Sequence, residues 1–168
     1  MTMATGMKAK DRKPRILVAG LGNLLLQDDG VGVHAVRELK KASLRGVIIA
    51  DVGCAVLDAL HLLQWAEKIL AIDAMQAGGK PGTVYTFGTQ DVEDAGVKAS
   101  LHELNLLAAL RFLPPGAKPE IVILGVEPET IGYGLDLSPR VAAALPLVTG
   151  AAREIVARWR ETPSPGKN

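Results

Sequence analysis

The stretch Ile16–Leu39, ILVAGLGNLLLQDDGVGVHAVREL, joins an apolar run to a glycine turn and then to an amphipathic helical pattern. This order is typical of the first strand of an α/β protein and the helix that covers it. Asp28 and Asp29 stand just before the helical pattern, where a nucleotide-binding protein would hold a phosphate. Like charges a few ångströms apart repel by roughly 1 to 4 kcal/mol. The turn therefore favours a cation over an anion.

The rest of the chain continues this alternation of short Val- and Ile-rich runs with helical patterns. It predicts an α/β three-layer sandwich, in which a twisted, mostly parallel five-stranded sheet has helices on both faces. The glycine-rich segment 78–82 predicts a tight connection and one antiparallel strand, so the sheet is expected to be mixed. The predicted strands are 15–19, 47–50, 68–72, 83–87 and 120–126, and the predicted helices are 30–42, 56–65, 101–112 and 139–160.

Length and composition predict one domain. The chain has 168 residues, of which 48% are hydrophobic, enough for one core. We expect a folded domain over 15–161, with a disordered arm at 1–14 and a disordered tail at 162–168. A net charge of +1 argues against nucleic acid as a partner. A single cysteine and the lack of a long apolar run predict a cytoplasmic protein, not inserted in a membrane, which we expect to be a monomer.

Two helix starts and one interruption are marked in the sequence. Ser100 with Glu103 forms a capping box, and Ser138 before Pro139 places a cap ahead of a residue that suits the first helical position. Pro146 lies inside the last helical pattern and is expected to kink or split that helix.

Three polar residues are predicted to meet at one edge of the sheet. Ligands of open α/β sheets bind beyond the carboxyl ends of the strands. Asp29 follows the first predicted strand, Asp73 ends the third, and His102 is the second residue of the helix that Ser100 would cap. Two carboxylates and a neutral imidazole suit a first-row divalent metal ion.

Structural roles remain open for the same residues. Asp28 or Asp29 could be an N-cap, Asp73 a turn residue and His102 a solvated side chain. Gly20, Gly22 and Asp51 could instead serve a nucleotide-binding module, although Leu25 stands where the fingerprint needs its third glycine. The remaining reactive residues, Cys54, His34 and His61, are predicted to be packing or surface residues.

Six short motifs follow one another between about residues 15 and 159: GLGNLLLQDDGVGV (20–33), DVG (51–53), IDA (72–74), LHELNL (101–106), GVEPE (125–129) and GLDLSP (134–139). In this order they resemble the motifs of the hydrogenase maturation endopeptidases, the proteases that trim the large subunit of nickel–iron hydrogenases.

The resemblance implies an endopeptidase that removes a C-terminal extension from the large-subunit precursor after nickel has been inserted. It implies metal ligands at Asp29, Asp73 and His102, which would also be the catalytic residues, and substrate contacts at Asp51 and Gly53. We expect the nickel to be carried by the substrate, with zinc or cadmium able to replace it in vitro. Asp28, or a carboxylate that the metal does not engage, is a candidate general base. A nickel assembly factor without protease activity is the remaining alternative within this resemblance.

Overall fold

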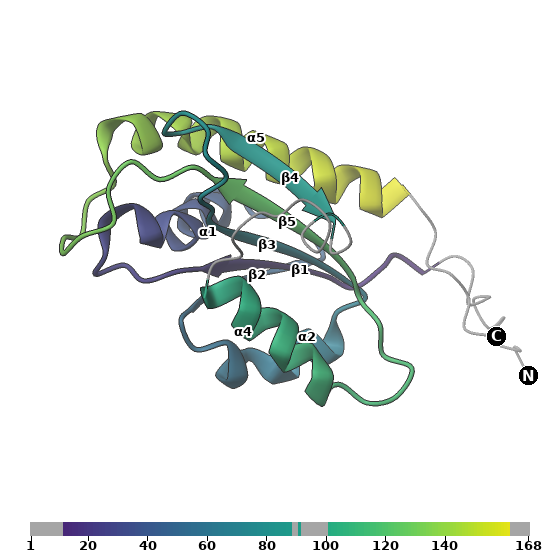
Figure 1. The fold of residues 1–168 in the computed structure, drawn as a ribbon. Helices are drawn as coiled ribbons and strands as arrows, with labels where there is room; N and C mark the ends of the chain where they lie inside the picture. The colour runs from purple at the N-terminus through teal and green to yellow at the C-terminus, as the bar shows by residue number, and fades with distance from the viewer. Residues whose placement is uncertain (1–11, 89–90, 92–100, 162–168) are drawn as a thin grey trace, which may run out of the picture.

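The computed structural model describes residues 12–88, 91 and 101–161. Its strands form one sheet in the order β2-β1-β3-β5-β4 (Figure 1). Four strands are parallel and β4 runs antiparallel to β5, which confirms the mixed five-stranded sheet. The strands are β1 (Ile16–Leu21), β2 (Val47–Gly53), β3 (Lys68–Ala74), β4 (Val84–Gly88) and β5 (Glu120–Val126).

The helices match the predicted segments, but two of those segments include a 3-10 turn and a third is preceded by one. The predicted helix at 56–65 divides into η3 (Val56–Ala59) and α2 (Leu60–Trp65), and η2 (Gln27–Gly30) precedes α1 (Val31–Lys41). The others are α4 (Leu101–Ala109), followed directly by η4 (Leu110–Phe112), and α5 (Pro139–Glu161). No helix in the described ranges combines the length and the apolar character needed to cross a bilayer.

Helices cover both faces of the sheet, so the predicted three-layer sandwich is confirmed (Figure 1). Neighbouring residues of a strand point to opposite faces. Val18 and Ile72 accordingly pack with α1 and α5, while Leu17 and Ala71 pack with the layer of α2 and α4. The two core layers meet only through the sheet, which explains why the central strands β1 and β3 are apolar on both faces.

Two glycines allow α1 to lie directly on the sheet. A Cβ atom added to Gly20 would lie 2.4 Å from the carbonyl oxygen of Gly32, and one added to Gly32 would lie 2.0 Å from the carbonyl oxygen of Ile72. Both separations are far below van der Waals contact. Gly20 and Gly32 therefore fix the distance of α1 from β1 and β3, and with it the position of the acidic turn that precedes α1.

Of the kink or split predicted at Pro146, the split does not occur, since α5 is one helix of 23 residues from Pro139 to Glu161. Pro146 is exposed, so the carbonyl group that its missing N–H leaves unpaired can be solvated. Val141, Val148 and Ala152 on the opposite side of α5 are fully buried against the sheet, on both sides of Pro146 in the chain.

The helix boundary predicted at Ser138 and Pro139 is confirmed, because α5 begins at Pro139. Ser100 lies outside the described residues, as do residues 1–11 of the predicted arm and the tail at 162–168. At the described end of the arm, the Arg12 guanidinium donates hydrogen bonds to both carboxylate oxygens of Glu67, at 3.1 and 2.6 Å. The chain is thus held against the domain three residues before the predicted start at residue 15.

Candidate functional site

The candidate site lies where the connections from β1 diverge. β1 has β2 on one side and β3 on the other, so the chain leaves β1 toward one edge and later crosses to the other side. Loops separate at such a switch point and leave a crevice beyond the carboxyl ends of the strands. Asp29 follows β1, and Asp73 is the next-to-last residue of β3. The topology therefore places both acids at the position that the sequence predicted.

Asp29 is fixed by two hydrogen bonds to one carboxylate oxygen. Its Oδ2 accepts from the backbone N–H of Asn23 at 2.9 Å and lies 3.0 Å from Nε2 of His102. His102 reaches it from the first turn of α4, and both side chains are largely buried. The predicted convergence of Asp29 and His102 is thus present in the fold.

The pKa of Asp29 is lower than that of a free aspartate. Burial alone would raise it, but the hydrogen bond and charge of His102 and the amide of Asn23 together outweigh burial. A carboxylate with a depressed pKa remains ionised at neutral pH. The site therefore offers a negative charge beside an imidazole.

Asp73 is fully buried, and its Oδ1 accepts a hydrogen bond from the N–H of Ala74 at 2.9 Å. Its place at the end of β3 does not expose it to solvent, because the loop after β1 approaches it closely. Strand alternation points it to the same face as Ala71 and Met75, which pack in the layer of α2 and α4. Asp73 therefore faces the layer that carries His102.

Gly22 allows the loop after β1 to approach Asp73 closely. With φ at +114°, a Cβ atom at this position would lie 1.8 Å from the carbonyl oxygen of Asp29 and 3.5 Å from Oδ1 of Asp73. The charges of Asp29 and Asp73 also act together on the Cys54 thiol, where both raise the pKa. Asp29, Asp73 and His102 thus surround one small region of the molecule.

The chemistry of this donor set fits a divalent metal ion. Two ligand atoms at right angles on a metal, each about 2.1 Å from it, are about 3 Å apart. Oδ2 of Asp29 and Nε2 of His102 have this separation. Within the described ranges, no group of three His, Cys, Asp or Glu side chains is already arranged to hold a metal ion. The metal role of the three residues remains a proposal.

Asp28 organises loops: it is not an N-cap, and its surroundings argue against the general-base role suggested for it. Its side chain is fully buried and caps neither η2 nor α1. Its carboxylate accepts from the amides of Glu129, Thr130 and Ser138 and from the Ser138 hydroxyl, at 2.7–2.9 Å. These bonds lower its pKa despite burial. A carboxylate so engaged is a weak proton acceptor.

The two predicted substrate residues lie at the end of β2. Asp51 is ion-paired with Arg37 of α1, whose nitrogen atoms lie 3.0 and 3.3 Å from its Oδ2. Gly53 adopts φ +57°, and its carbonyl oxygen accepts a hydrogen bond from the N–H of Gly22 at 3.2 Å. Gly53 therefore borders the candidate site through Gly22, while Asp51 already has a partner on the neighbouring helix.

The remaining reactive residues have other surroundings. Cys54 is exposed as a residue, but its sulfur is partly buried against the carbonyl oxygen of Gly22. This burial and the charges of Asp29 and Asp73 raise the pKa of the thiol, so Cys54 is a poor nucleophile at neutral pH. His61 lies at the surface, with Nδ1 3.2 Å from the carbonyl oxygen of Asp58. His34 is half-buried in α1. The structural roles expected for these three residues agree with these positions.

Glu127, which follows β5, was not singled out from the sequence. It is buried, and its Oε2 accepts hydrogen bonds from the amides of Ala77 and Gly79 and from the Tyr85 hydroxyl, at 2.9–3.2 Å. Glu127 thereby fixes the loop that follows Asp73. The available signal was an acid directly after an apolar strand, the same signal that identified Asp73.

Comparison with known proteins places the chain among relatives that act in hydrogenase maturation. The family model described as "Hydrogenase maturation protease" matches residues 33–155. The Hydrogenase 2 maturation protease of Escherichia coli is 32% identical over 155 residues, covering 88% of this chain and 92% of the relative. The HupD hydrogenase expression/formation protein of Rhodobacter capsulatus is 32% identical over 152 residues, or 86% and 72% of the two chains.

Solved structures lead to the same family. The hydrogenase-maturating endopeptidase HybD of E. coli has a TM-score of 0.75 at 29% identity, covering 89% of this chain and 98% of its own. The HybD protease of Thermococcus kodakarensis has a TM-score of 0.75 at 27% identity, with 84% and 99% covered. The matches extend through both halves of the sheet and the helices on each face. The chain belongs to the hydrogenase maturation protease family.

Proposed function

We propose that this protease removes the C-terminal extension of a nickel–iron hydrogenase large-subunit precursor once nickel has been inserted, and that Asp29, Asp73 and His102 recognise that nickel. The observation that carries the proposal is the pairing of Asp29 with His102 above the buried Asp73. These side chains form an O, O, N donor set of the kind that a first-row divalent ion prefers.

In this proposal the ion arrives as part of the substrate. Three protein ligands leave a coordination shell incomplete, so the thiolates that hold nickel in the precursor can remain bound while the protease docks. A precursor without metal brings no cation to the two carboxylates, so its complex lacks this attraction. The donor set thus distinguishes a loaded from an unloaded precursor. Zinc or cadmium, with similar ligand preferences, is expected to replace nickel in vitro.

Among the residues that the structure describes, no activated serine or cysteine lies at this position, so attack by water is the simplest route to hydrolysis. A divalent ion polarises a carbonyl group or lowers the pKa of a bound water. Because Asp28 is engaged by four donors, we assign the proton-accepting role to a carboxylate oxygen of Asp29 or Asp73 that does not bind the metal. Gly53 lines the approach beside Gly22, where the substrate backbone would lie, and Asp51 lies next to it.

The decisive experiment incubates the purified chain with a nickel-loaded large-subunit precursor from the same source and follows the precursor's mass. A large subunit shortened at one peptide bond supports the proposal, and the metal-free precursor should remain intact. A nickel assembly factor would bind the precursor without shortening it. Mass spectra that show no shortening of any loaded precursor would refute the protease assignment. We also expect the chain to act as a monomer in the cytoplasm, where the metal-binding thiols of the precursor and the thiol of Cys54 would both be in the reduced state.

A further inference from the structure

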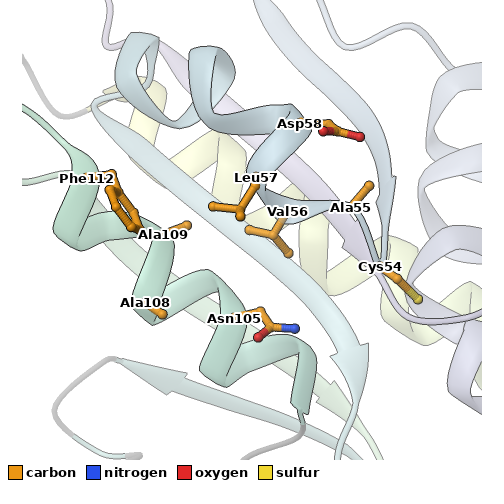
Figure 2. A pocket seen from close by; sticks show the side chains of 9 residues that line it. All are labelled: Cys54, Ala55, Val56, Leu57, Asp58, Asn105, Ala108, Ala109 and Phe112. Atoms are coloured by element: carbon orange, nitrogen blue, oxygen red, sulfur yellow. The ribbon is translucent and has the colours of Figure 1, made fainter.

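A pocket begins at the edge of the candidate site and extends along α4 (Figure 2). Its volume is about 370 Å³, at the small end of the range for ligand pockets. One wall consists of the loop and the 3-10 turn that follow β2, with Cys54, Val56 and Leu57. The other wall is one side of α4 and η4, with Ala108, Ala109 and Phe112.

The pocket is continuous with the candidate site through two elements. At its near end, the Cys54 sulfur lies 3.6 Å from the carbonyl oxygen of Gly22, the residue that separates Asp29 from Asp73. Along its length, Asn105, Ala109 and Phe112 follow His102 at intervals of three or four residues. This spacing places them on the side of the helix that carries the His102 side chain.

The pocket has an apolar floor and an apolar rim. Val56 and Ala109 are buried beneath it, whereas Leu57 and Phe112 are 63% and 66% exposed. Figure 2 shows these side chains facing one another across the space between η3 and α4. A ligand that enters between these two exposed apolar side chains would cover both of them.

We propose that this pocket receives the segment of the substrate that carries the scissile bond, with an apolar side chain lying between Leu57 and Phe112. The inference rests on the proposed protease function and adds a specificity site to it. From His102 to Phe112 the helix spans about 15 Å, the length of four or five residues of extended chain. The Asn105 amide lies near the His102 end and can bond the substrate backbone. Asp58 adds a negative charge, so an apolar or basic segment fits better than an acidic one.

The test is to fill the pocket without altering the candidate site. Ala108 is exposed on α4 and lines the pocket, so Ala108→Phe should occupy the space and leave the core unchanged. Ala143→Phe is the matched control, because Ala143 is exposed on α5 on the other face of the sheet. Processing of the nickel-loaded precursor is measured at several concentrations. In parallel, precursor binding to the immobilised protease is measured.

Ala108→Phe should raise KM and weaken precursor binding by roughly tenfold, with kcat changed less than twofold, because a filled pocket removes ground-state contacts. Ala143→Phe should behave like wild type. Ala108→Phe with unchanged KM and binding would overturn the proposal. If Ala108→Phe does not fold, Phe112→Asp provides the same test, because it puts a charge on an already exposed rim. If the wild-type protein binds the precursor but does not cleave it, the proposed protease function is refuted. The comparison of precursor binding by Ala108→Phe and Ala143→Phe then still tests whether the pocket receives the substrate.

Discussion

Oδ2 of Asp29 and Nε2 of His102 lie 3.0 Å apart although 73 positions separate them in the chain. Asp29 comes from the turn after the first strand, and His102 from a helix on the opposite face of the sheet from α1. Their contact therefore joins the loop after β1 to the helix layer that Asp73 faces. It is the feature of the fold on which the metal-recognition proposal depends.

Loss of either the imidazole or the buried charge should stop processing without unfolding the protein. His102→Ala removes the proposed nitrogen ligand, and Asp73→Asn removes a charge while keeping an oxygen that can accept from the Ala74 amide. Both variants should lose at least about tenfold in kcat/KM, since loss of a group that only supports a metal ligand already costs roughly 10- to 100-fold. Processing is read by mass spectrometry, and folding by circular dichroism. A wild-type rate in either variant would refute the site.

Asp28→Asn should destabilise the protein, since an amide nitrogen would replace one acceptor oxygen among four donors. Each buried donor left without an acceptor costs roughly 1 to 3 kcal/mol. Chemical denaturation should show a loss of this size, and the loop with Glu129 and Thr130 should become more open to proteolysis. A variant as stable as wild type would show that this hydrogen-bond cluster contributes little.

The same carboxylate should make stability depend on acid pH. The pKa of Asp28 is lower in the folded state than in the unfolded chain, where it is about 3.9. Its contribution is therefore fully present above about pH 4 and is lost as pH falls through the lower folded-state pKa. The stability difference between wild type and Asp28→Asn should narrow below that pH. Denaturation curves at neutral and acid pH test this, and a constant difference would count against it.

A methyl group added at Gly32 should lower the stability of the protein, whereas one added at Gly150 should raise it. The Cβ of Gly32→Ala would lie 2.0 Å from the Ile72 carbonyl oxygen, which forces α1 away from the sheet. Overpacking of this kind typically costs 1 to 3 kcal/mol, and displacement of α1 should also lower activity. Gly150 lies in α5 with no atom near the added methyl, so Gly150→Ala should stabilise by roughly 0.5 to 1 kcal/mol. Equal thermal shifts for the two variants would contradict the packing argument.

The Cys54 thiol reports on the charge of the site independently of catalysis. Burial, Asp29 and Asp73 raise its pKa, so at pH 8 it should react with iodoacetamide more slowly than a free cysteine. Asp73→Asn removes one of these charges and should lower the pKa and accelerate alkylation severalfold. Asp58→Asn, in the same pocket, is the control and should leave the rate unchanged. Identical rates in all three proteins would show that Asp73 does not influence this region.

Much of the fold followed from local pattern. The β5 prediction matched the observed strand, and the tight turn at 78–82 correctly indicated an antiparallel neighbour. Pro146 shows where local rules failed, because burial of the helix face at Val141, Val148 and Ala152 outweighs one missing hydrogen bond. The role of Asp28 was not predictable for a related reason: its four hydrogen-bond donors come from residues more than a hundred positions away in the chain.

The sequence by itself determined the strand and helix order, the mixed sheet and the candidate acids at the strand ends, because these depend on periodicity and on residues close together in the chain. Only the tertiary structure decided which acid faces His102 and which is enclosed by backbone amides. Asp28 and Asp29 are neighbours of the same type, and no local rule distinguishes them. Their roles depend on which loop packs above each side chain, and the crossing of distant segments at the end of the sheet sets that packing.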